Sequence, residues 1–162
     1  MRRGTPKTSL QKVTDVPWVE VGFGSCVNRA LAVEEEILEK CKRASYSEDD
    51  LFAIKLALEE ALVNACKHGN KLDRDKQVKV QYRVTPQRLD VAVEDEGPGF
   101  KPSELQDPTV PENLERCGGR GVLLMRWCMN NVVYNSRGNR VTLTKFKNGE
   151  GLPPSQSNAA MG

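Results

Sequence analysis

The stretch QVKVQYRVTPQRLDVAVE, residues 77–94, decides the fold class of this chain of 162 residues. Apolar residues alternate with polar ones in residues 77–84 and again in residues 88–94, which is the period of a strand with one buried face. The connection TPQ between them is short enough for a hairpin. The stretch therefore predicts two antiparallel strands that share an apolar face.

The second strand runs directly into the turn DEGPGF, residues 95–100. Asp95 places a hydrogen-bond acceptor at the strand end, and Pro98 stiffens the turn. Gly97 and Gly99 allow a tight turn and let a flat ring approach the backbone. We interpret the turn as a holder for a nucleotide base; the alternative is an ordinary surface turn.

Before this hairpin, the chain predicts one strand and two helices. The segment WVEVGF (18–23) alternates like a strand, and the segment 25–44 has apolar residues at roughly helical spacing, with Ser25 as a candidate cap. The acids of SEDD (47–50) mark the start of a second helix, because carboxylates favour a helix N-terminus. This helix should run from about 48 to 68 and stop at Gly69.

After the hairpin comes a long irregular segment, residues 96–121, of the kind that forms functional lids or is disordered. VLLMRWCM (122–129) then predicts a buried helix, and NVVYNS (131–136) with RVTLTKF (140–146) predicts a second hairpin. Hairpins separated by helices indicate an α+β two-layer sandwich, in which helices cover one face of an antiparallel or mixed sheet.

Composition excludes several classes of protein. The net charge is only +2, and no apolar run approaches the roughly 20 residues of a membrane helix, so we expect neither nucleic acid nor a membrane as a direct partner. The five cysteines are odd in number and form no CxxC pair, which argues against a disulfide framework or a zinc knuckle. No apolar signal segment opens the chain, so we expect a cytoplasmic protein.

The second helix carries a candidate reactive pair. Glu60 and Asn64 are four residues apart and therefore share a helix face, flanked by alanines at 53, 57 and 61. A carboxylate can deprotonate an attacking hydroxyl, and an amide oxygen is a suitable ligand for Mg²⁺. The alternative is a solvent-facing acid and amide on an amphipathic helix.

A third motif, RCGGRG at 116–121, precedes the apolar helix. Backbone N–H groups at such a helix start can cradle an anion, and Arg116 and Arg120 could add charge-assisted bonds to phosphate oxygens. Taken alone, the motif is also typical of a flexible loop.

Together, EEALVNACKHGN (59–70), VEDEGPGF (93–100) and ENLERCGGRGVLLM (112–125) resemble the motif set of the GHKL ATPases and kinases. Within that superfamily the chain is most similar to the compact bacterial anti-sigma-factor serine/threonine kinases of the RsbW and SpoIIAB type. The resemblance covers about residues 12–147, which we take as one ATP-binding kinase domain. Residues 1–11 would be a flexible N-terminus and residues 148–162 a disordered tail.

The resemblance implies a role for each motif residue. Glu60 matches the general base, Asn64 the Mg²⁺ ligand, and Asp95 the acceptor of the adenine amino group. The remaining matches lie around the nucleotide: Gly97 and Gly99 at the base pocket, Arg116 near the terminal phosphate or the protein partner, and Gly118, Gly119 and Gly121 at the phosphates. Arg120 stands where many relatives have a small or apolar residue, and either contacts a phosphate or faces solvent. His68 and Gly69 match the end of the helix, where we favour a structural role.

The resemblance also implies a function. The protein would bind Mg·ATP, bind a sigma factor, and phosphorylate an anti-anti-sigma (STAS-type) antagonist, with a homodimer formed through residues 18–23 and 27–43. The alternatives are a nucleotide-binding regulatory module with little turnover, or a kinase that serves a switch unrelated to sigma factors. One departure stands out: many relatives have GTT before the last strand, and this chain has GNR at 138–140.

Overall fold

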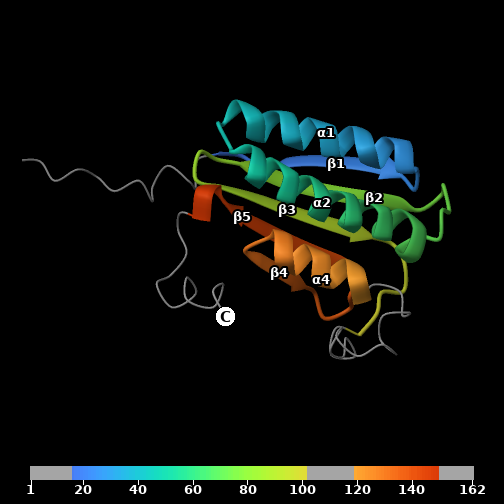
Figure 1. Ribbon diagram of the computed structural model, residues 1–162. Coiled ribbons are helices and arrows are strands. Elements are labelled where there is room, and N and C mark those ends of the chain that lie inside the picture. The colour runs from blue at the N-terminus through green and yellow to red at the C-terminus, as the bar shows by residue number, and fades with distance from the viewer. Residues whose placement is uncertain (1–15, 102–118, 150–162) are drawn as a thin grey trace, which may run out of the picture.

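The computed structural model describes residues 16–101 and 119–149, and within them it confirms the predicted α+β sandwich. One antiparallel sheet has the order β1-β2-β3-β5-β4, and the helices cover one of its faces (Figure 1). The strands are β1 (Val19–Gly24), β2 (Gln77–Val84), β3 (Arg88–Asp95), β4 (Asn131–Tyr134) and β5 (Arg140–Phe146). The expected N-terminal segment and residues 150–162 of the expected tail lie outside the described residues.

The helical layer consists of α1 (Val27–Arg43), α2 (Glu48–Asn64) and α4 (Gly119–Cys128). A π-helical turn, η2 (Ala65–Gly69), extends α2, and a short 3₁₀ turn, η4 (Lys147–Gly149), follows β5. In Figure 1, α2 lies between α1 and α4, and α2 packs against both of them. Among the described helices, none combines the length and apolar character needed to cross a membrane.

The register of the central hairpin explains why its apolar residues form one surface. Val80 pairs with Val93 and Tyr82 pairs with Val91, so the apolar positions of β2 and β3 face the helices together. A slip of one residue would turn all of them to the other face, which fixes the register.

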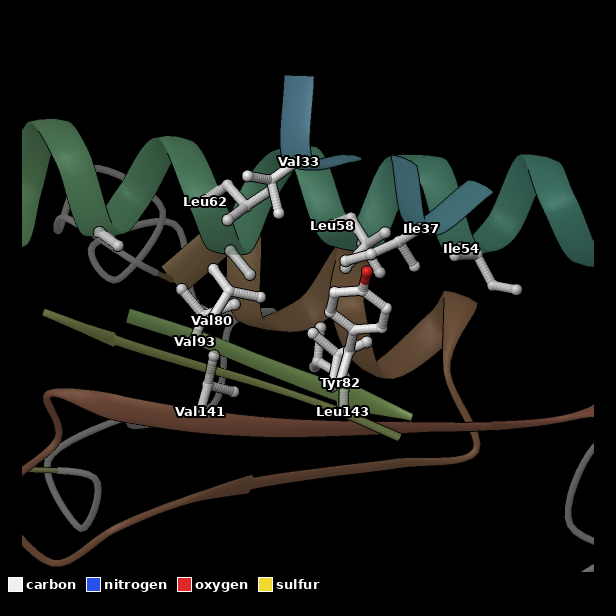
Figure 2. Close-up of a cluster of buried hydrophobic side chains, with 14 of the residues drawn as sticks. Val33, Ile37, Ile54, Leu58, Leu62, Val80, Tyr82, Val93, Val141 and Leu143 are labelled. Atoms are coloured by element: carbon white, nitrogen blue, oxygen red, sulfur yellow. The ribbon is translucent and has the colours of Figure 1, made fainter. Parts of the chain in front are cut away.

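The core lies between this sheet face and the helices (Figure 2). Val33 and Ile37 of α1 and Ile54, Leu58 and Leu62 of α2 point toward Val80, Tyr82, Val93, Val141 and Leu143 of the sheet. The apolar face of α2 and of the turn that extends it is buried in this core, as the low exposure of five residues shows: Ile54, Leu58, Ala61, Leu62 and Ala65. The Tyr82 hydroxyl bonds to two half-exposed side chains of α1: it accepts from Lys40 Nζ at 2.8 Å and donates to Glu36.

The helix starts agree with the sequence only in part. Ser47 caps α2 as expected, since its hydroxyl accepts from the Asp50 N–H at 3.1 Å. Ser25 does not cap α1; its hydroxyl donates to the Lys76 carbonyl at 2.9 Å, and the cap position falls on Cys26. The helix predicted at 122–129 begins earlier, so Gly119, Arg120 and Gly121 form its first turn rather than a loop before it. This helix is buried on one face only.

Candidate functional site

A pocket of about 170 Å³ opens between the end of α2, the turn after β3, and the β4–β5 hairpin. Asn64 and His68 line it from the helical side, Asp95 and Gly99 from the turn, and Asn139 from the hairpin. Three segments far apart in sequence therefore meet at one cavity, and two of them carry residues that the sequence selected.

Asp95 sits in a space made by two glycines. A Cβ atom on Gly69 would lie 2.3 Å from the Asp95 Cγ, and a Cβ atom on Gly97 would lie 2.1 Å from the Gly69 carbonyl oxygen. Both positions are therefore restricted to glycine by close packing. Gly97 also donates its N–H to Asp95 Oδ1 at 2.8 Å, which orients the carboxylate. The structural role predicted for Gly69 is thus to leave room for Asp95.

The electrostatics of Asp95 suit a buried acceptor. Burial raises the pKa of the Asp95 carboxyl above its usual value, and the hydrogen bond from the Gly97 N–H partly opposes this rise in pKa. The carboxyl is therefore easier to protonate than that of an exposed aspartate. As the pH is lowered, Asp95 would become protonated, and lose part of its acceptor capacity, at a higher pH than an exposed aspartate does.

Two asparagines that sequence reasoning did not select hold this turn in place. Asn70 is fully buried; its Oδ1 accepts from the Glu96 N–H at 2.8 Å and its Nδ2 donates to the Gln77 carbonyl at 2.9 Å. Asn139 donates from Nδ2 to the Asp95 carbonyl at 2.9 Å, and its own carbonyl accepts from the Asp95 N–H at 2.9 Å. The stretch GNR, which departs from the family pattern, thus supplies a direct support for the end of β3.

The turn and the hairpin meet backbone to backbone. Gly99 and Gly138 both have positive φ, of 73° and 75°. A Cβ atom on Gly99 would lie 2.0 Å from the Arg137 carbonyl oxygen, and one on Gly138 would lie 1.9 Å from the Phe100 carbonyl oxygen. Glycine is required at both positions for conformation and for space.

An aromatic pair forms another side of the pocket. The rings of Phe100 and Tyr134 meet edge to face with centroids 5.0 Å apart, and both residues line the cavity. Burial raises the pKa of Tyr134 to about 12, so its hydroxyl stays protonated. The sequence placed Tyr134 only in a strand; its inward position follows from the alternation of β4.

Glu60 lies one helical turn before Asn64 and faces α4. A Cβ atom on Gly121 would lie 2.2 Å from Glu60 Oε1, so the carboxylate rests against the first turn of α4. Glu60 is half-buried, and Arg120 next to Gly121 is exposed. The acid of the predicted reactive pair is therefore beside the predicted phosphate cradle.

The structure thus brings together most of the predicted site. Asn64, Asp95 and Gly99 line the pocket, Gly97 donates its N–H to the Asp95 carboxylate, and Glu60 contacts Gly121 on α4. Gly119 begins α4. Arg116 and Gly118 lie outside the described residues, so their assignments stay predictions.

Comparisons with known proteins agree with this fold. A family model described as "Histidine kinase-like ATPase domain" matches residues 27–145. The chain is similar to "Serine-protein kinase RsbW" of Bacillus subtilis (strain 168), with 36% identity over 115 residues, covering 67% of this chain and 72% of that protein. It is also similar to the protein of the same name from Listeria innocua serovar 6a, with 33% identity over 113 residues, covering 65% of this chain and 72% of that protein.

Proposed function

Because this chain belongs to the histidine kinase-like ATPase domain family, we propose that it is a Mg·ATP-dependent protein serine/threonine kinase that also acts as an anti-sigma factor. The names of its relatives support the kinase activity. The observation that carries the proposal is the placement of Asn64 and Asp95 on one pocket, with Glu60 beside the start of α4.

Asp95 would accept a hydrogen bond from the adenine amino group. Its carboxylate is held by the Gly97 N–H, and its backbone is fixed by Asn139. A carboxylate fixed before the ligand arrives loses little freedom on binding, which favours affinity for a base with a donor in that place.

Asn64 would hold the magnesium ion. Its amide lines the pocket on the side of α2 that also carries Glu60, and an amide oxygen suits a hard cation that takes most of its ligands from phosphates and water. When bound, magnesium would neutralise charge on the phosphate oxygens. The N–H groups of the first turn of α4, at Gly119 and Gly121, would bind the phosphates from the other side.

Glu60 would act as the general base. A serine hydroxyl of the protein substrate would give its proton to the Glu60 carboxylate as its oxygen bonds to the terminal phosphorus of ATP, and the bond to the ADP oxygen would break. The products are phosphoserine and ADP. Since the chain supplies little covalent chemistry, positioning and charge stabilisation would provide most of the rate.

The substrate in this proposal is a STAS-type anti-anti-sigma protein, which competes with a sigma factor for the kinase. Phosphorylation adds a charge of roughly −2 and would weaken the complex with the antagonist. The kinase would form a homodimer through β1 and α1. Since a sigma factor acts with RNA polymerase, the proposed location is the cytoplasm.

The test is transfer from labelled ATP to a candidate antagonist, with Glu60→Gln as the key variant. The matched control is Glu59→Gln, because Glu59 is the neighbouring acid and is exposed. The proposal expects transfer to a serine that disappears in Glu60→Gln and persists in Glu59→Gln, with ATP binding kept in both. ATP binding by the wild type without transfer would identify a regulatory module instead, and no binding of ATP would overturn the proposal.

A further inference from the structure

Helix α4 presents an exposed apolar stripe beside the proposed reaction centre. Val122 and Met125 of this helix are buried in the core, whereas Leu124 is 37% exposed and Trp127 is 83% exposed. Arg120, Leu124 and Trp127 recur at intervals of four and three residues and so share the outer side of the helix; we call them the α4 stripe. An indole left almost wholly in water forgoes a large burial energy, which points to a partner that covers it.

The position of the stripe limits what that partner is. Glu60 rests against Gly121, which is in the first turn of the same helix. A serine that gives its proton to Glu60 must come within about 3 Å of the carboxylate, so the body of a folded substrate has to lie on the surface around it. Helix α4 lies on the side of α2 away from α1 and provides part of that surface (Figure 1).

The charge of α4 indicates the chemistry of the partner. The helix carries Arg120 and Arg126, both exposed, and its sequence GRGVLLMRWC contains no acidic residue. Tryptophan and arginine are also the residue types most often found to dominate protein–protein binding energy. A partner that fits this surface presents an apolar side chain flanked by carboxylates.

We propose that the α4 stripe, together with the exposed Arg126 beside it, is the docking surface for the protein substrate, which binds it through an acidic segment bearing an exposed apolar side chain. This inference rests on the proposed kinase function, since it takes Glu60 as the reacting group. Docking there would bring the acceptor serine to Glu60, while the docking contacts on the α4 stripe themselves lie outside the residues that line the nucleotide pocket. Loss of the stripe would therefore weaken the binding of the protein substrate and leave the binding of ATP unchanged.

The experiment measures steady-state transfer to the antagonist that the wild type phosphorylates in the assay above. Trp127→Ala should raise the KM for the antagonist at least about tenfold, with kcat and the KM for ATP unchanged. Arg126→Glu, which reverses the charge beside Trp127, should also raise the KM for the antagonist. Trp127→Phe should recover part of the loss. The control is Phe52→Ala, since Phe52 is an aromatic residue of α2 that is also exposed, at 65%, and it should leave both KM values unchanged.

Two results would overturn the docking surface while the kinase function stands. One is an unchanged KM for the antagonist in Trp127→Ala and Arg126→Glu. The other is a change from dimer to monomer in Trp127→Ala by sedimentation, which would assign the stripe to contact between copies of this chain. If the wild type transfers no phosphate, the proposed function fails and the docking inference falls with it, so the two failures are distinguishable.

Discussion

Replacing Gly121 by alanine tests the contact between α2 and α4 on which the proposed chemistry depends. The new methyl group would lie 2.2 Å from Glu60 Oε1 and 2.8 Å from Glu60 Cγ, whereas ordinary contacts begin at 3.4 Å. The carboxylate therefore has to move by roughly 1 Å. Glu60 is half-buried at the end of a flexible side chain, so it can turn toward solvent without distorting the backbone.

The two consequences of this change have opposite signs. A displacement of about 1 Å at a reacting group costs on the order of 100-fold in rate, so phosphotransfer by Gly121→Ala should fall by that factor. Alanine is the better helix former by about 0.5–1 kcal/mol, so the free energy of unfolding should stay level or rise slightly. ATP binding should persist, because the methyl group points at Glu60.

Three measurements on Gly121→Ala check this reasoning: transfer at saturating ATP, ATP binding by calorimetry, and urea denaturation. The control is Gly22→Ala, because a Cβ atom there would meet only Gln77 Oε1 at 3.4 Å, and its transfer rate should match the wild type. A transfer rate within about threefold of the wild type would refute the placement of Glu60 as base. A loss of more than about 2 kcal/mol in stability would show that the contact is not relieved by side-chain rotation.

Three further predictions concern residues around the pocket and between the helices. Asn70→Ala removes two hydrogen bonds from a fully buried side chain and should lower the free energy of unfolding by about 2–4 kcal/mol in urea denaturation; a loss under about 1 kcal/mol would contradict this. Burial, reinforced by the charge of Glu59, raises the pKa of Glu34, whose Oε2 is buried without a hydrogen-bond partner. The protonated side chain therefore contributes stability that is fully present below the ordinary carboxyl pKa. That stability is lost as the pH rises through the higher pKa of the folded state. Glu34→Gln should remove that decline and add about 1 kcal/mol at pH 7, and an unchanged pH profile of stability would argue against it. Because burial also raises the pKa of Asp95, calorimetry should show ATP affinity falling as pH is lowered through that raised value, with no such step in Asp95→Asn.

The local signals in the sequence account for most of the fold. Strict alternation predicted β2 and β3 within one residue, and the acids after Ser47 predicted the start of α2. These signals act between near neighbours, so they can be read without knowing the tertiary structure. The prediction of Ser25 as a helix cap was wrong because its hydroxyl donates to the carbonyl of Lys76, a residue distant in the sequence that no local signal indicates.

Residues of the candidate site could be predicted only where the residue type itself indicates the chemistry that it can perform. Glu60, Asn64 and Asp95 carry side-chain groups that are able to accept a proton or a hydrogen bond or to coordinate a cation. The four-residue spacing of Glu60 and Asn64, and the position of Asp95 at a strand end, led to their prediction as site residues. Asn70 and Asn139 act by holding backbone groups 26 and 44 residues away, and no local pattern reports such a pairing. Trp127 was predicted in a buried helix but is exposed, because α4 packs on one face only. Which face of the helix is covered depends on the tertiary packing of the elements around α4, and the local sequence does not report it.

Calorimetric titration with ATP and Mg²⁺ of the wild-type protein and of Asp95→Ala shows whether the pocket at Asp95 holds the nucleotide. We expect measurable heat of binding for the wild type, with one ATP bound per chain, and loss of that binding in Asp95→Ala while the variant stays folded. Equal affinity in the two proteins would place the nucleotide elsewhere than this pocket. No heat with the wild type across a range of temperatures would contradict the claim that this pocket holds ATP at all.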